Sequence, residues 1–146
     1  MKNLLLLIIL LPGYSWSCSC AYDRSMEEVV AKSKVVFYGE VIGVEKIGKI
    51  VQSGEMQQYK ITIYPQEVYK GKPRSRYVFK GAKYYNDTDK DDVVVGGCSL
   101  DVALGEKYVI FVEKGKNVEW DWCSEHILPK ETKKYEYFIQ NIKPGL

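Results

Sequence analysis

The first apolar stretch of the chain, residues 4–11, has no polar face at any period. It follows a basic start and is ended by Pro12, with small residues further on at Ser15 and Ser17. This order is typical of a secretory signal peptide with a small-x-small cleavage site, and the apolar run is too short to cross a bilayer. We therefore expect export, either to the extracellular space or to a bacterial periplasm.

Cleavage after Ser17 would make residues 1–17 the signal peptide and Cys18 the first residue of a single domain, 18–146. Two alternatives are an uncleaved N-terminal anchor or buried helix, and lipidation of Cys18 as in bacterial lipoproteins. The bulky Trp16 argues against lipidation, because such signals prefer small or aliphatic residues before the cysteine. We expect no membrane span in the exported domain.

Alternating or β-branched apolar patterns predict five strands in the exported domain. Tyr59, Ile61 and Ile63 alternate with polar residues, which predicts a half-buried strand, and Pro65 predicts an edge position or a bulge. Glycines within the first expected strand suit a bent or bulged segment. The expected strands are residues 34–45, 59–64, 76–81, 107–115 and 117–123.

Two short helices are expected, one near each end of the domain. Ser25 and Glu28 form a capping-box pattern ahead of an apolar face, and Tyr135, Phe138 and Ile142 have the spacing of an amphipathic helix. Strands flanked by helices, without strand–helix–strand alternation, predict a mainly β protein. We expect a five-stranded antiparallel OB-fold barrel with short flanking helices.

Charge and motif content argue against several function classes. Lys and Arg number 21 against 19 Asp and Glu, so the chain lacks the basic excess typical of nucleic-acid binding. His126 is the only histidine, and phosphate-binding, zinc-protease and serine-nucleophile motifs are absent. A metal cluster of Asp121, Glu125 and His126 is conceivable, but a solvated polar loop is the better interpretation. We therefore expect neither an enzyme nor a cofactor of its own.

Four cysteines, Cys18, Cys20, Cys98 and Cys123, lie after the signal-like segment. In an exported chain they imply two disulfides. Only one residue separates Cys18 from Cys20, so they are poorly placed to bridge each other. This leaves the two pairings that join them to Cys98 and Cys123. Either pairing would attach the new N-terminus to the fold at two points.

An N-terminal Cys18 would also carry a pair of metal ligands. Its α-amine and its own carbonyl oxygen form a bidentate pair, and an α-amine with a pKa of about 8 can give its lone pair to a metal at neutral pH. The open coordination position of a catalytic zinc in another protein is a suitable target. The alternative is that the disulfides only stabilise a secreted domain.

The run KGKPRSR places Lys70, Lys72, Arg74 and Arg76 at every second position. On an extended chain these cations would share one face and would bind an anionic polymer or surface in a salt-dependent manner. A solvated turn is the alternative interpretation. Asn86 begins a glycosylation sequon in a polar, acidic segment.

Together these residues resemble the N-terminal domain of the tissue inhibitors of metalloproteinases, which is a netrin-like OB-fold domain. The motifs that carry the resemblance are CSC directly after the signal peptide, VVFYGEVIG, YKITI, EVYKG, GGCSLDV, KYVIFVEKG and WDWC. They are spread over nearly the whole of 18–146.

The resemblance implies the disulfides Cys18–Cys98 and Cys20–Cys123. It also implies that the amine and carbonyl of Cys18 chelate the zinc of a target protease, and that Ser19 enters the specificity pocket of that protease. The hairpin tip at 48–55 would be an accessory contact. The implied protease-binding residues are Cys18, Ser19, Cys20, Ala21, Tyr22, Val95, Gly96 and Gly97.

The chain departs from the family in lacking its third disulfide and its cysteine-rich C-terminal domain. Residues 21–24 also replace a proline-rich stretch. The leading hypothesis is a secreted, monomeric inhibitor of zinc metalloproteases. The alternative is a netrin-like module without inhibitory activity that binds a protein partner or an anionic polymer or surface.

Overall fold

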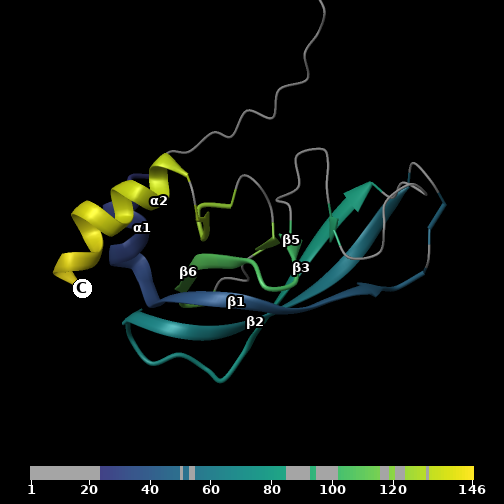
Figure 1. Ribbon diagram of the computed structural model, residues 1–146, viewed down its shortest axis with the longest axis horizontal. Coiled ribbons are helices and arrows are strands. Elements are labelled where there is room, and N and C mark those ends of the chain that lie inside the picture. The colour runs from purple at the N-terminus through teal and green to yellow at the C-terminus, as the bar shows by residue number, and fades with distance from the viewer. Residues whose placement is uncertain are drawn as a thin grey trace, which may run out of the picture.

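The computed structural model describes residues 24–49, 51–52, 55–84, 93–94, 102–115, 119–120, 124–130 and 132–146. Its main element is a sheet in which five strands run antiparallel in the order β3, β2, β1, β6, β8 (Figure 1). These strands are β1 (Ser33–Ile47), β2 (Met56–Lys70), β3 (Tyr77–Tyr84), β6 (Lys107–Glu113) and β8 (Ile127–Pro129). The expected mainly β class is confirmed.

The two longest strands, β1 and β2, pair along most of their length and bend together. The register of this pair shifts between Tyr38 and Gly39 and again between Val41 and Gly43. Pro65 lies opposite Gly39, at the first of these irregularities, and β3 pairs with β2 only between its residues 56 and 63. Pro65 has no amide hydrogen to donate, and it lies where β3 no longer pairs with β2, so no hydrogen bond to β3 is lost. The expected bulge is confirmed.

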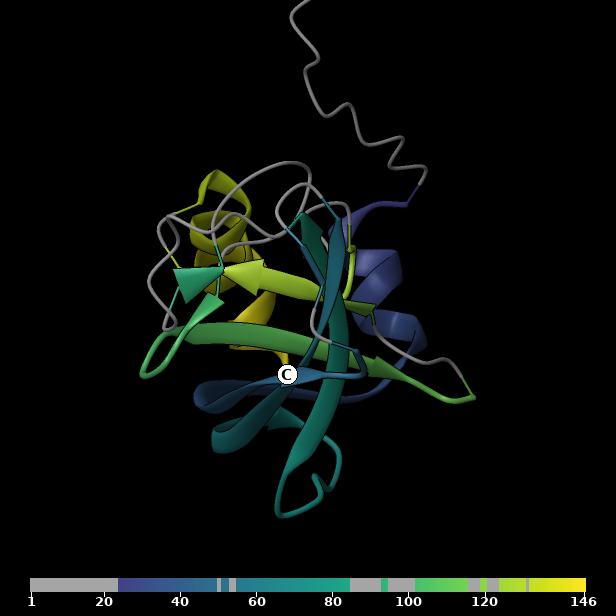
Figure 2. The same cartoon turned by 90° about the vertical axis from the view of Figure 1, so that its right-hand side faces the viewer.

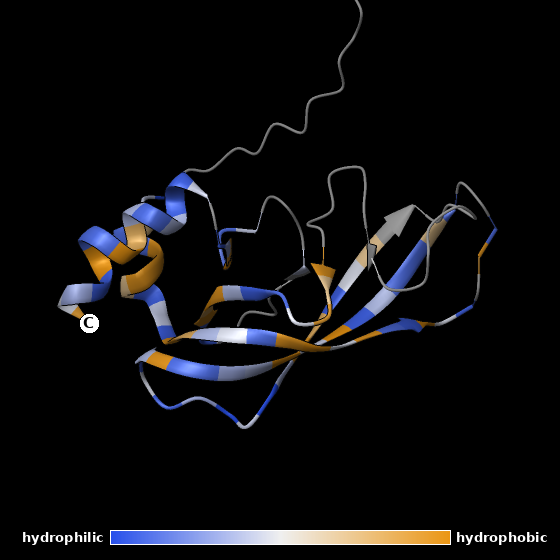
Figure 3. Cartoon of the chain, in the orientation of Figure 1, coloured by the Kyte–Doolittle hydropathy of each residue, from blue (hydrophilic) through white to orange (hydrophobic). Residues whose placement is uncertain are grey.

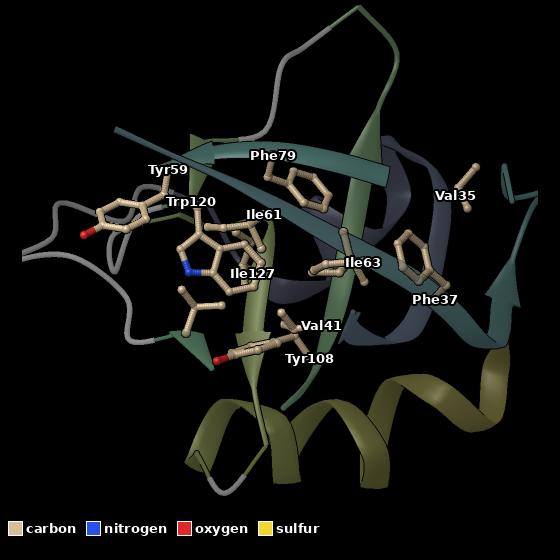
Figure 4. Packing of buried hydrophobic residues seen from close by; sticks show 12 residues of the cluster. Val35, Phe37, Val41, Tyr59, Ile61, Ile63, Phe79, Tyr108, Trp120 and Ile127 are labelled. Atoms are coloured by element: carbon tan, nitrogen blue, oxygen red, sulfur yellow. The ribbon is translucent and has the colours of Figure 1, made fainter. Parts of the chain in front are cut away.

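Successive residues of a strand point to opposite faces of the sheet. At the sheet centre both faces are buried, each in its own hydrophobic core. Figure 3 shows the resulting alternation of hydropathy along the strands, and Figure 4 shows the larger of two cores. The larger core contains Val35, Phe37, Val41, Tyr59, Ile61, Ile63, Phe79, Val102, Tyr108, Ile110, Trp120 and Ile127. The second contains Val29, Val30, Val36, Val109, Phe111, Leu128 and Phe138.

Helices at both ends of the described chain cover this second core. They are α1 (Met26–Lys32) and α2 (Lys133–Tyr137), and α2 continues through the π-helical turn η1 (Phe138–Ile142) into the 3₁₀ turn η2 (Lys143–Gly145). Figure 2 is turned by 90° from Figure 1, so that the side away from the helices faces the viewer and strands lie in front of both helices. Phe138 is fully buried, and its ring meets that of Phe111 edge-on with centroids 5.5 Å apart. The expected amphipathic face is confirmed.

Local capping explains where each helix begins. The Ser25 hydroxyl accepts the amide of Glu28 at 3.2 Å, as the capping-box pattern predicts, while the Glu28 carboxylate pairs with Lys32 at 2.5 Å. At the other end of the chain, the Thr132 hydroxyl accepts the amide of Tyr135 at 3.1 Å. Both helices therefore start at a side-chain cap that satisfies an amide of the first turn.

Three features differ from the sequence prediction. The expected strand at 117–123 is described only as β7 (Glu119–Trp120), which pairs parallel to β3 instead of antiparallel. β8 was not expected, and β4 (Val93–Val94) and β5 (Val102–Ala103) form a small second sheet. Within the described part of the chain no ladder joins the outer strands β7 and β8, so the sheet is open there.

Candidate functional site

The residues that the sequence assigns to protease binding lie outside the described residues. This holds for the N-terminal segment Cys18, Ser19, Cys20, Ala21 and Tyr22, for Val95, Gly96 and Gly97, and for Cys98 and Cys123 of the expected disulfides. Asn86 of the sequon also lies outside. The structure does describe the points at which both segments join the fold.

Arg24, six residues after Cys18, is held by carboxylates from two separate parts of the chain. Its Nη1 atom lies 2.5 Å from Oε1 of Glu113, the last residue of β6. Its Nε donates to Oε2 of Glu125 at 2.5 Å, and its Nη2 pairs with the same carboxylate. We call this arrangement the Arg24 clamp.

The Arg24 clamp is largely shielded from solvent. The side chains of Arg24, Glu113 and Glu125 are 16%, 7% and 18% exposed. The hydrogen bonds to Glu113 and then to Glu125 raise the pKa of Arg24 above its ordinary value, and desolvation opposes them. A guanidinium bonded to two carboxylates suits this arrangement, because its planar fork presents several donors in fixed directions.

A groove of about 610 Å³ lies beside the clamp, between α1, β8 and the start of α2. Buried Val29, Ile127 and Leu128 line it. Glu27 and Tyr137 line it as well, and the Tyr137 hydroxyl donates to the Glu27 carboxylate at 2.5 Å. Lys133 and Lys134 also line the groove. The base of the N-terminal segment therefore adjoins an apolar hollow with charged residues in its wall.

The segment containing Val95 to Gly97 begins and ends at a short hairpin. Val94 pairs with Val102, and the chain after β5 is fastened to β1 through Val41. The Val41 amide donates to the Glu106 carbonyl at 2.8 Å, and the Gly105 amide donates to the Val41 carbonyl at 2.9 Å. The segment 95–101 is therefore preceded by β4 and followed by β5, which pair with each other.

The tip between β1 and β2, expected as an accessory contact, is partly described. Gln57 is 1% exposed, and its side-chain amide donates to the carbonyl oxygens of Ile47 and Gln58, each at 3.0 Å. Its side-chain oxygen accepts the amide of Val51 at 3.4 Å. A buried glutamine therefore ties the tip to the end of the ladder.

The four cations of KGKPRSR differ in their surroundings. The Nζ of Lys70 donates to the carbonyl oxygens of Val30 and Ala31, at 2.7 and 3.2 Å, at the end of α1. Lys72, Arg74 and Arg76 are exposed, and no carboxylate among the described residues pairs with them. A binding face formed by the four cations stays a prediction, and the ammonium of Lys70 is engaged at the end of α1.

The suggested cluster around His126 is not assembled in the part of the chain that the structure describes. Glu125 is bound to Arg24, and Asp121 lies outside the described residues. Across the described ranges, no three His, Cys, Asp or Glu side chains come together as a metal site. In the same ranges, no helix is long and apolar enough to cross a membrane.

Comparison of the sequence with protein-family models and with curated proteins finds no match. The functional interpretation therefore rests on the residues and their geometry. Sequence reasoning missed the Arg24 clamp, because Arg24 and its partners are 89 and 101 residues apart. It also missed the burial of Gln57, because a polar residue that is followed by a second glutamine gives no sign of burial in the sequence.

Proposed function

We propose that this protein is a secreted netrin-like OB-fold domain that inhibits zinc metalloproteases through the free N-terminal amine and the carbonyl oxygen of Cys18. The observation that carries the proposal is the place of Cys18. It directly follows a signal-like run in the sequence and stands six residues before the Arg24 clamp. A chelating N-terminus needs such a firm base, because a freely moving segment loses conformational entropy on binding.

The strand arrangement supports the OB-fold part of the proposal. β1, β2 and β3 form a meander, β6 pairs with the other side of β1, and β7 runs parallel to β3. The bulges at Gly39 and Gly43 supply the bend that a small barrel requires. Closure of the barrel would join the β7 side of this sheet to the β6–β8 side.

The Arg24 clamp is consistent with a disulfide from the N-terminal segment to Cys123, for which the family resemblance implies Cys20. Arg24 is four residues after Cys20, and Glu125 is two residues after Cys123, so the ion pair joins the same two parts of the chain. At about 3.3–3.6 Å per extended residue, both cysteines are within reach of this contact. The remaining Cys18 would then bridge to Cys98, which lies between β4 and β5.

Chelation follows from the chemistry of a free N-terminus. With a pKa of about 8, the α-amine of Cys18 can lose its proton to a competing metal at neutral pH. Its nitrogen and the Cys18 carbonyl oxygen would take the position at the protease zinc that the attacking water otherwise uses. Ser19 would occupy the adjacent specificity pocket, with Cys20, Ala21 and Tyr22 continuing along the cleft and Val95 to Gly97 beside it.

The test compares oxidised protein that begins at Cys18 with a matched protein that carries one added alanine before Cys18. Both are assayed against a small panel of zinc metalloproteases after both disulfides are verified. We expect only the unextended protein to inhibit, because the extension converts the amine into an amide. Equal inhibition by both forms, or inhibition of no protease by either, would contradict the proposal.

A second candidate function rests on the exposed cations Lys72, Arg74 and Arg76. These would bind an anionic polymer or surface, with an affinity that falls as salt screens the charges. The test is elution from immobilised heparin by a salt gradient, with a Lys72→Gln/Arg74→Gln/Arg76→Gln variant as the comparison. Identical elution of the two proteins would reject this function, whatever the outcome of the protease assay.

A further inference from the structure

We infer that the outer face of β1, β2 and β3 docks an acidic segment of a partner protein, in which carboxylates flank an apolar side chain. In Figure 1 these strands extend away from α1 and α2. None of the residues involved belongs to the proposed protease-binding set, so the docking surface is independent of inhibition. We call it the outer patch, and it comprises Ile42, Gly43, Tyr64, Arg76, Val78 and Lys80.

Strand alternation places the outer patch on the face opposite the larger core. Thr62 lies between Ile61 and Ile63, which are both buried in that core, so its side chain points to the other face. Gly43 on β1 and Val78 on β3 are the cross-strand partners of Thr62 and share this face. The three strands therefore present one outward row across the sheet.

This row contains a hollow of about 400 Å³ at Gly43, which has no side chain to fill it. Ile42 and Val78 line the hollow and are 52% and 53% exposed. Tyr64 follows Thr62 on the same face and is 51% exposed. Single exposed apolar residues are normal on a protein surface, whereas several around one hollow are typical of an interaction site.

The charges beside the hollow favour an acidic partner. Lys60 and Lys80 are direct cross-strand partners, a position in which like charges repel. Glu45 pairs with Lys60 at 2.7 Å, and no carboxylate in the described ranges pairs with Lys80 or Arg76. Arg76 lines the hollow itself, so a carboxylate bound to its guanidinium would lie next to the apolar side chains.

Other occupants would meet only part of this surface. A sulfated polymer would use the cations but would leave Ile42, Tyr64 and Val78 in water. A second copy of the chain on a two-fold axis would bring the same cations against each other, because such an interface joins identical patches. A peptide segment with an apolar side chain between carboxylates satisfies both the hollow and the cations.

Two substitutions test the hollow and the charge separately. Gly43→Val fills the hollow, and an added Cβ would lie 3.5 Å from Cβ of Thr62, which is an ordinary contact. Arg76→Gln removes the exposed charge beside it. If Gly43→Val folds poorly by thermal unfolding, Val78→Glu replaces it, because this exposed position accepts a carboxylate that would repel an acidic partner.

The experiment selects random peptides displayed on phage against the oxidised parent protein, and the most enriched peptide is synthesised for titration calorimetry. We expect enriched peptides to carry an apolar residue flanked by Asp or Glu. Gly43→Val and Arg76→Gln should each weaken binding of the synthetic peptide by about tenfold or more. The matched control is Leu104→Ser, at a 58% exposed apolar position outside the outer patch, which should bind as the parent does.

Several outcomes would overturn the inference. They are enrichment of no peptide, enrichment of peptides without carboxylates, and equal binding by the parent and Gly43→Val. Weaker binding by a Lys72→Gln/Arg74→Gln variant, with none by Gly43→Val, would assign the binding to the basic run instead. A dimer in sedimentation velocity that Gly43→Val dissociates would make a second copy the occupant. The protease assay decides none of these outcomes.

Discussion

The side chain of Lys70 ends on the carbonyl oxygen of Val30, with 2.7 Å between Nζ and oxygen. The last residue of β2 thereby satisfies carbonyl groups at the end of α1, where a positive charge also interacts favourably with the helix dipole. The contact joins elements that are 40 residues apart in the chain. It withdraws Lys70 from the exposed basic run and gives it a role in stability.

Replacement of Lys70 by glutamine should lower the free energy of unfolding by about 1–2 kcal/mol, because carbonyl oxygens of α1 lose a charged donor. Chemical denaturation with a fluorescence readout measures the change. The same substitution at exposed Lys72 is the matched control and should change stability by less than about 0.5 kcal/mol. Equal effects at the two positions would show that Lys70 is not a helix cap in solution.

Gly71 should tolerate no side chain. Its φ of +74° disfavours other residues, and an added Cβ would overlap the carbonyl oxygen of Lys34. We expect Gly71→Ala to cost more than about 3 kcal/mol, since backbone must move. Gly48 has a similar φ of +78° with nothing within 4 Å of an added Cβ, so Gly48→Ala should cost only about 1 kcal/mol. Thermal unfolding of both variants checks the difference.

Alkaline pH should destabilise the contact between β2 and the C-terminal helix through Tyr69. Desolvation, and next the charge of Glu67, raise the pKa of Tyr69 above its ordinary 10.0. Because the folded pKa is the higher one, the stabilisation is present below pH 10 and is lost as the pH rises toward the folded pKa. Above pH 10 the free energy of unfolding should therefore fall less steeply with pH in Tyr69→Phe than in the parent.

The control for this experiment is Tyr64→Phe on the same strand, where the side chain is exposed. It should leave the slope of stability against pH as it is in the parent. If both phenylalanine variants show the parental slope, Tyr69 is not the group responsible for alkaline destabilisation.

Phe138→Ala should detach the C-terminal helix from the sheet. The ring is fully buried and meets Phe111 and Tyr69, with centroid distances of 5.5 and 5.6 Å. Truncation leaves a cavity and should cost about 3–5 kcal/mol in unfolding free energy. Leu146→Ala, at an exposed position, should cost less than about 0.5 kcal/mol. A small loss at Phe138 would mean that the helix packs elsewhere in solution.

Several elements could be predicted because their signal is local. Alternation at Tyr59, Ile61 and Ile63 predicts a strand face, and these side chains are 6%, 1% and 0% exposed. The Ser25 cap and the apolar spacing around Phe138 likewise lie within one or two helical turns. In each case the periodicity or the cap involves residues that are close together in the chain, so it can be read from the sequence.

Other features depend on which distant segments meet. β7 has two residues and β8 three, too few for a period to appear, and both take their places only by pairing with β3 and β6. β7 also runs parallel to β3, and no local sequence pattern predicts the direction of so short a strand. The second small sheet was missed for the same reason.

The sequence by itself determined the mainly β class and the positions of the long strands and helices, and it contains the cysteine pattern on which the proposed function rests. Only the tertiary structure decided that Lys70 caps α1 and that Arg24 is clamped by Glu113 and Glu125. Charged side chains have no periodicity that reveals their partners. Their roles are set by long-range packing, which brings a donor and its acceptors together and removes them from water.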